Sequence, residues 1–232
     1  MKCNLLVVAA WTAAATVLLP QGEVHASLLE LTARPGTGDI IDWGQIGTPN
    51  LTLTGPQSFT STGGTTGNVS FNGTSFLVEQ CCIGLTGTFN GNFAPGDVVM
   101  VASSPLSINF NTPVQSVGAQ IQDNNIGDMF TAEILAFSGS TLLGAFTESG
   151  VSGDLGNNSN IFLGVRDTSA DITSVTYLTF TASPGFSLQD VAINQMSIGV
   201  GVTPLPSTLP LFVTGLGIIG LLGWYQKRKA VA

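Results

Sequence analysis

Apolar and polar residues alternate with a period of two along much of the chain. The odd positions of 117–122 are Val, Ala and Ile, and the even positions of 130–137 are Phe, Ala, Ile and Ala. The odd positions of 161–166 are apolar in the same way. Because successive side chains of a strand point to opposite faces, each run predicts a half-buried β-strand. The runs 172–181 and 187–198 carry apolar residues on both faces in places, which is typical of central strands.

Turn-forming residues interrupt these runs at short intervals. The clusters are Thr62-Gly63-Gly64, Asn72-Gly73, Asn90-Gly91, Pro95-Gly96-Asp97, Ser138-Gly139-Ser140, 153–160 and Ser183-Pro184-Gly185. No window of eleven or more residues between 27 and 203 has a helical period, and no fixed-period repeat points to a solenoid or propeller. The pattern predicts one all-β domain over 27–202, a β-sandwich or jelly roll. The Gly-, Ser- and Thr-rich stretch 55–70 fits long loops as well as strands.

The N-terminal segment 1–26 has the pattern of a secretory signal peptide. Lys2 precedes an uncharged apolar run over 5–19, and Val24-His25-Ala26 supplies small residues before a cleavage site. We expect cleavage between Ala26 and Ser27. An N-terminal membrane helix is the alternative, and the short run with its polar, cleavable end fits that alternative less well.

A second apolar segment, 209–225, contains no charged residue and is followed by Lys227, Arg228 and Lys229. As a helix it would span about 25 Å at ~1.5 Å per residue, slightly less than the ~30 Å hydrocarbon core of a bilayer. Basic residues after the span place the C-terminus in the cytoplasm and the body outside. We therefore expect a transmembrane helix within a C-terminal tail over 203–232. A buried core helix is the alternative, although the segment is not amphipathic.

Charge and composition exclude several classes of function. The chain carries a net charge of −8 at pH 7, and between 27 and 203 its only basic residues are Arg34 and Arg166. Nucleic-acid binding requires clustered Lys and Arg, so we expect no nucleic-acid partner. The single histidine, His25, lies in the predicted signal peptide. The mature chain therefore cannot form a Ser-His-Asp or Cys-His catalytic arrangement.

The C-terminal tail resembles a known sorting signal. Pro204-Leu205-Pro206, the apolar span and the basic stop at Lys227 to Lys229 are together similar to the PEP-CTERM signal of Gram-negative bacteria, with Leu205 where that family has glutamate. The resemblance implies an inner-membrane intermediate that an exosortase, a cysteine-type processing enzyme, recognises. The body would then be released to the cell surface or to the extracellular polysaccharide matrix of a biofilm. Prolines also keep this segment extended, which suits a protease.

The body resembles uncharacterised proteins that carry this sorting tail. The similar stretches are Asp39–Trp43, Gln80–Gly84, Gly87–Asp97, Pro113–Gln122 and Ala192–Gln195. No activity is assigned to that group, so the resemblance implies no reaction. We therefore expect a non-catalytic surface or matrix protein that associates with exopolysaccharide. The alternative is a polysaccharide-active enzyme that uses two carboxylates, with candidates among Asp39, Asp42, Glu79, Asp97, Asp123, Asp128 and Glu133.

Two further groups of residues are candidates for ligand binding. Trp43, beside Asp42, is the candidate aromatic platform for a sugar ring, and a place in the core is the more common role of such a residue. Asp123, Asn125 and Asp128 concentrate oxygen ligands of the kind that Ca²⁺ prefers. The same residue types are also what a bare β-turn requires. Calcium is thus the only cofactor that the sequence points to.

The adjacent cysteines Cys81 and Cys82 are the only thiols after removal of the signal peptide. In an oxidising compartment they could close a strained vicinal disulfide, pair with another chain, or stay reduced and buried. Neighbouring Cα atoms lie ~3.8 Å apart, whereas disulfides usually join Cα atoms about 4.4–6.8 Å apart. A vicinal bond would therefore be easily reduced, and the sequence leaves the three states open.

Overall fold

The computed structural model describes residues 28–34, 38–79, 93, 96–125, 127–153, 160–181 and 187–200. Strands make up 71% of these residues, and every strand pairing among them is antiparallel. The all-β prediction is confirmed. The described residues include one short 3-10 helix, η1 (Trp43–Gln45). Within the described ranges, no helix has the length and apolar character needed to cross a membrane.

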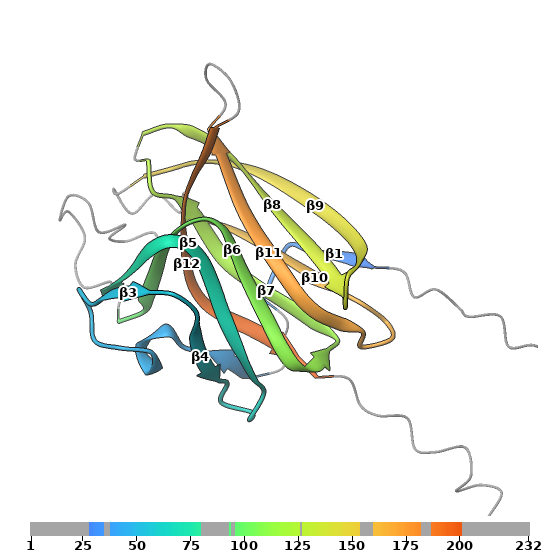
Figure 1. The fold of residues 1–232 in the computed structure, drawn as a ribbon. Coiled ribbons are helices and arrows are strands. Elements are labelled where there is room, and N and C mark those ends of the chain that lie inside the picture. Colours follow the sequence, from blue (N-terminus) through green and yellow to red (C-terminus); the bar gives the residue numbers. More distant parts are fainter. Residues whose placement is uncertain are drawn as a thin grey trace, which may run out of the picture.

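The strands form a single twelve-stranded sheet (Figure 1). They are β1 (Leu29–Leu31), β2 (Asp39–Ile41), β3 (Thr52–Thr54), β4 (Gln57–Thr60), β5 (Thr66–Glu79), β6 (Val98–Val114), β7 (Ser116–Asp123), β8 (Met129–Ser138), β9 (Thr141–Val151), β10 (Ile161–Arg166), β11 (Ile172–Thr181) and β12 (Ser187–Gly199). The main order is β1-β10-β7-β12-β11-β6-β5-β3. Strand β2 pairs with β12, β4 pairs with β5, and β8 joins β11 to β9.

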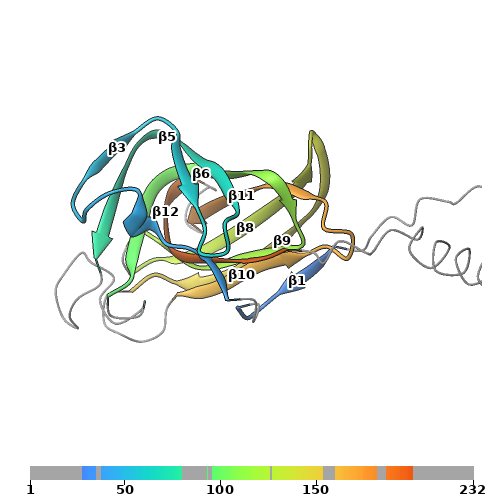
Figure 2. The same cartoon turned by 90° about the horizontal axis from the view of Figure 1, so that it is seen from below.

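Strand β6 changes its partner halfway along. Residues 100–103 pair with β12, and residues 106–109 pair with β11. Between these segments lies Pro105, which lacks the N–H that a regular ladder would use. The sheet curves back on itself (Figure 2), and the Tyr177 hydroxyl of β11 donates to the Leu163 carbonyl of β10 at 3.2 Å. Residues of β8 and β11 therefore share one core with residues of β7 and β10.

The buried positions follow the predicted alternation. The apolar residues of β7, β8 and β10 that the pattern placed on one face are buried in one cluster, except Ile161, which is half-buried against it: Val117, Ala119, Ile121, Phe130, Ala132, Ile134, Ala136, Leu163 and Val165. Val175 and Tyr177 of β11 are buried in the same cluster. Burial of a large aliphatic or aromatic side chain contributes roughly 1.5–3 kcal/mol. This shared face is what drives the sheet to close over itself.

Two local expectations need correction. The Gly-, Ser- and Thr-rich stretch 55–70 forms β4 and the first part of β5 rather than only loops. Asn72-Gly73 does not separate two strands, because it lies inside β5, where the register against β6 shifts. Gly73 has φ 74°, a conformation that glycine adopts without steric cost. This glycine bends a long strand instead of ending it.

Candidate functional site: a polar pocket on β7, β10 and β12

A β-bulge in β12 organises the candidate site. Ile193 pairs with Ile121 of β7, and Met196 pairs with Ala119, so two residues of β12 lie opposite Gln120 alone. A bulge of this kind redirects side chains and is common beside binding sites. Here it brings the side chains of Asn194 and Gln195 next to that of Gln120.

Asn194 is fully buried and connects three distant segments. Its Nδ2 donates to Asp97 Oδ2 and to Gln120 Oε1, each at 2.9 Å. Its main-chain carbonyl accepts from Trp43 Nε1 at 2.8 Å. Its Oδ1 is buried without a partner among the described residues. Because buried hydrogen bonds fix orientation, Asn194 holds the Asp97 and Gln120 side chains in set positions.

These fixed groups line a pocket of about 570 Å³. The residues around it are Ala33, Arg34, Asp97, Gln120, Phe162 and Gln195. The lining combines a guanidinium, a carboxylate, two amides and one aromatic ring. Side chains of these types offer both donors and acceptors at close range. The pocket therefore offers hydrogen-bond donors, acceptors and an apolar surface to a ligand.

The Phe162 ring lies against two glycines at the edge of this pocket. Gly164 of β10 pairs directly with Gly118 of β7. A Cβ atom on Gly118 would come within 2.6 Å of Phe162 Cζ and 2.9 Å of Gly164 Cα. The absence of both side chains thus makes room for the ring. Phe162 is half-buried and lines the pocket, so it presents a supported apolar surface beside the polar groups.

Trp43 does not form the sugar platform that was a candidate from the sequence. Its side chain is fully buried in the core, and its indole N–H is used by Asn194. Asp42 caps η1, since its Oδ1 accepts from the Gly44 N–H at 2.9 Å. Both residues are structural. Trp43 nevertheless supports the pocket from within the core, because it fixes the backbone that carries Asn194.

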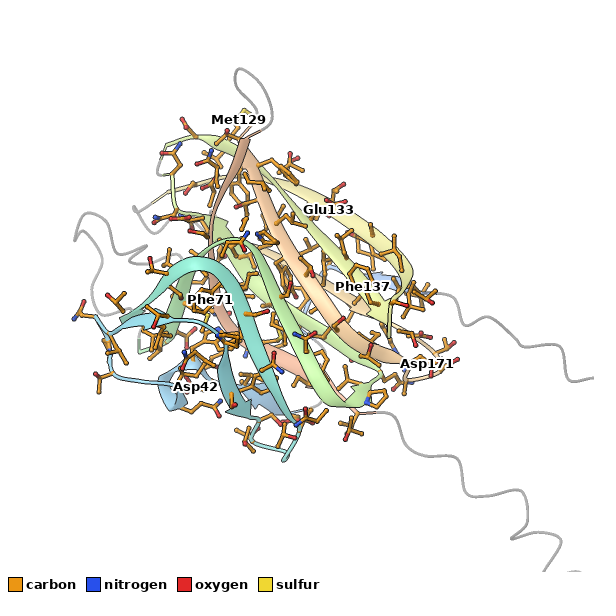
Figure 3. The ribbon with its side chains drawn as sticks, in the orientation of Figure 1. Asp42, Phe71, Met129, Glu133, Phe137 and Asp171 are labelled. Atoms are coloured by element: carbon orange, nitrogen blue, oxygen red, sulfur yellow. The ribbon has the colours of Figure 1, made fainter. Side chains whose placement is uncertain are left out.

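The candidate carboxylates of the alternative, enzymatic function do not gather in one place, although Asp123 and Asp128 lie in the same turn. Asp42, near η1, lies far from Glu133 on β8 (Figure 3). Asp39 is buried, and both of its carboxylate oxygens already accept hydrogen bonds, from the Gly63 N–H at 2.6 Å and from the Thr65 hydroxyl at 3.1 Å. Among the described lining residues of the pocket, Asp97 is the only carboxylate. A glycosidase requires two.

Asp123, Asn125 and Asp128 belong to a turn. A turn was one of the two alternatives that their residue types predicted. Asp123 Oδ1 accepts from the Asn125 N–H at 2.9 Å, and Asn125 Nδ2 donates to Asp128 Oδ2 at 2.6 Å. Asp123 is fully buried, and its Oδ2 has no partner among the described residues. Burial raises the pKa of Asp123 to about 6, the Asn125 N–H opposes this rise, and the nearby Asp128 and Asp190 add to it.

A small cavity adjoins this carboxylate. It has a volume of about 190 Å³ and is lined by Asp123, Asn124, Asn125, Leu188, Gln189 and Asp190. Within the described ranges, no three His, Cys, Asp or Glu side chains are arranged to hold a metal ion. Asp123, Asn125 and Asp128 are linked by hydrogen bonds in the turn, and calcium binding by this set stays a prediction from the sequence.

Several predicted sites lie outside the described residues. These are the signal cleavage site at Ala26 and Ser27, the cysteines Cys81 and Cys82, the processing motif Pro204-Leu205-Pro206 and the basic stop Lys227, Arg228 and Lys229. They stay predictions from the sequence.

Alternation alone did not identify the pocket residues Asn194, Gln195, Gln120 and Phe162. The sequence predicted a resemblance to proteins with this tail in the stretches Asp39–Trp43, Gly87–Asp97, Pro113–Gln122 and Ala192–Gln195, which include Gln120, Asn194 and Gln195 but not Phe162. In the structure each of these four stretches supplies one member of the network around Asn194. Four segments that are distant in the sequence thus meet at Asn194.

No protein-family model matches the chain, and no curated protein matches it. Among solved structures, the chain is similar to a DUF4465 family protein from Bacteroides caccae, with a TM-score of 0.38 and 8% sequence identity. That similarity covers 73% of this chain and 99% of the other. We transfer no function from it.

Proposed function

We propose that this protein is an exported, non-catalytic β-sandwich of the jelly-roll type that binds polysaccharide at the cell surface or in the extracellular matrix. The observation that carries the proposal is the pairing of a supported aromatic ring, Phe162, with the fixed polar groups of Gln120 and Asp97. Sugars present both an apolar ring face and a row of hydroxyls. Stacking and paired hydrogen bonds are the interactions that such a surface supports.

The charge of the protein favours a neutral polysaccharide. The chain carries a net charge of −8, and the described residues lining the pocket include one cation, Arg34, and one anion, Asp97. A polyanion would be repelled by the surrounding acidic surface. Neutral sugars with vicinal hydroxyls avoid that cost and match the amides of Gln120 and Gln195.

The export route in this proposal rests on the two terminal segments. A signal peptide over 1–26 would bring the chain across the inner membrane, and the tail over 203–232 would hold it there until an exosortase acts near Pro204 to Pro206. Intact-mass measurement of the protein from culture medium and from membranes of its host tests this route. We expect a released species that starts at Ser27 and lacks Lys227 to Lys229. A membrane species that keeps the tail would make the protein permanently anchored.

Binding to neutral polysaccharides, measured by glycan array and then calorimetry, tests the pocket. We expect Phe162→Ala to weaken binding by roughly tenfold, since an aromatic stacking contact is worth about 0.5–1.5 kcal/mol beyond buried area. Gln120→Ala should weaken binding as well, because it removes a hydrogen-bonding group. Phe137→Ala is the matched control, since Phe137 is a half-buried phenylalanine of β8 that does not line the pocket.

Two results would count against the proposal. Equal binding by Phe162→Ala and the Phe137→Ala control would remove the pocket from recognition. New reducing ends, detected when the protein is incubated with the bound polysaccharide, would support the alternative of a carboxylate-dependent enzyme. In that case Asp97→Asn should abolish product formation while retaining binding.

A further inference from the structure

The second cavity lies at the far end of the same strand pair and has a different chemistry. Asp123 ends β7, and its neighbour across the ladder is Val191 of β12. The Asn124 N–H donates to the Asp190 carbonyl at 3.0 Å, so the two acidic segments are joined through their backbones. Both Asp123 and Asp190 line the cavity of about 190 Å³. Two carboxylates from different strands therefore share one small polar space.

Neighbouring segments hold Asp123 in place without neutralising it. Its main-chain carbonyl accepts from the Ser152 hydroxyl, which in turn accepts from Gln122 Nε2 at 3.0 Å. Its Oδ1 accepts from the Asn125 N–H. Its Oδ2 is buried and has no partner among the described residues. A buried carboxylate oxygen without a partner is costly unless a positive charge or a proton compensates it.

The described part of the chain supplies no cation for this role. Arg34 lines the other pocket, and Arg166 pairs with Ser116 at the opposite end of β7. Seven residues of strand separate Ser116 from Asp123, or roughly 23 Å at ~3.3 Å per residue. No other lysine or arginine occurs between 27 and 203. Since no described residue neutralises Asp123 Oδ2, a species from solution is the natural source of compensation.

We propose that this cavity is a binding site for a hard divalent cation such as Ca²⁺, held by Asp123 Oδ2 and the Asp190 carboxylate. Ca²⁺ takes six to eight oxygen ligands, and the asparagine amides of the cavity and water would complete its shell. A water molecule occupies about 30 Å³, so the cavity has room for an ion with several waters. The proposal is independent of polysaccharide binding, because it uses none of the pocket residues.

This site differs from the one that the sequence indicated. Asp128 Oδ2 is hydrogen-bonded to Asn125, and Asp190 of β12, not Asp128, lines the cavity together with Asp123. With two carboxylates and the rest of the shell from neutral oxygens, the site belongs with the weak extracellular calcium sites, with a Kd on the order of 0.1–1 mM. Such an affinity suits a protein exported to a medium that contains calcium.

Calorimetric titration of protein produced from the full chain, first stripped with EDTA, tests the site directly with CaCl₂. We expect one site of sub-millimolar to millimolar affinity and a melting temperature that rises with CaCl₂ concentration. Asp190→Asn should weaken binding at least tenfold, and Asp123→Asn should abolish it. Asp171→Asn is the matched control, because Asp171 is an exposed aspartate outside the cavity, and it should bind as the wild type does.

If Asp123→Asn fails to fold, the test depends on Asp190→Asn. This variant should fold, because Asp190 is only half-buried. Unchanged calcium affinity in Asp190→Asn would overturn the proposal. So would a wild-type protein whose melting temperature does not respond to calcium, which would leave a proton as the species that neutralises Asp123.

Discussion

The two cavities lie along the same pair of strands, β7 and β12, and each adjoins one buried polar atom without a partner among the described residues. Behind the pocket residues Asp97 and Gln120 that atom is Asn194 Oδ1, which belongs to a neutral amide. In the smaller cavity it is Asp123 Oδ2, which belongs to a carboxylate. The amide makes three other hydrogen bonds through its nitrogen and its main-chain oxygen. The carboxylate accepts one hydrogen bond, from the Asn125 N–H, and faces the charges of Asp128 and Asp190.

This difference explains why the two sites call for different ligands. A neutral buried amide orients its neighbours at modest cost, so the Asn194 network can hold Asp97 and Gln120 ready for a polar ligand. A buried carboxylate beside a second carboxylate raises the free energy of the folded state until a cation or a proton arrives. The pocket thus presents fixed polar groups to a ligand, whereas the smaller cavity binds a cation or a proton.

Substitution of Gly118 by alanine should have the largest effect, because it should disturb ligand binding at the pocket and leave the smaller cavity unchanged. The new Cβ would come within 2.6 Å of Phe162 Cζ and 2.9 Å of Gly164 Cα. Overpacking of this kind typically costs about 1–3 kcal/mol, and the ring must leave its position on the glycines. We expect a lower free energy of unfolding in urea and weaker polysaccharide binding, with calcium affinity unchanged.

Gly144→Ala on β9 is the control for this change. There the new Cβ would meet only Leu28 Cδ2, at 2.9 Å, and the end of a leucine side chain can move. We expect little loss of stability and normal binding of both ligands. Full polysaccharide binding by Gly118→Ala would show that the position of the Phe162 ring does not matter.

The sequence predicted those parts of the fold that depend on local alternation. The buried faces of β7, β8 and β10 follow from residues two apart, and the pairing of long strands buries them together. Glycine was a less certain guide, since Gly64 and Gly139 mark turns whereas Gly73 bends a continuous strand. Only the partner strand decides whether a glycine ends a strand or kinks it.

The candidate site could be predicted only in fragments. The alternation in 161–166 placed Phe162 on the face opposite the core, but nothing in the sequence indicated that Gly118 lies beneath its ring. The bulge at Asn194 is set by the register of β12 against β7, which no short motif encodes. Asp190 was missed as a partner of Asp123 for the same reason, because strand pairing rather than spacing brings them together.

Titration of Asp123 should give the smallest effect and the sharpest test of the difference between the two cavities. The pKa of Asp123 is raised from 3.8 to about 6 by burial, with added repulsion from Asp128 and Asp190. Between about pH 4 and 6 the folded protein therefore binds more protons than the unfolded chain. The contribution of Asp123 to the free energy of unfolding is fully present below pH 4 and is lost as the pH rises through 6.

The measurement compares urea unfolding of wild type and Asp123→Asn in EDTA from pH 4 to 7. Carboxylates remote from Asp123 affect both proteins alike, so the difference between the two proteins reports chiefly the Asp123 proton, for which the slope is at most ~1.4 kcal/mol per pH unit. We expect wild type to lose stability relative to the variant as pH rises, and saturating CaCl₂ to cancel that loss by favouring the charged carboxylate. Parallel curves in EDTA would mean that Asp123 is not a buried, unpaired acid. If saturating CaCl₂ does not cancel the loss of stability, a proton alone neutralises Asp123.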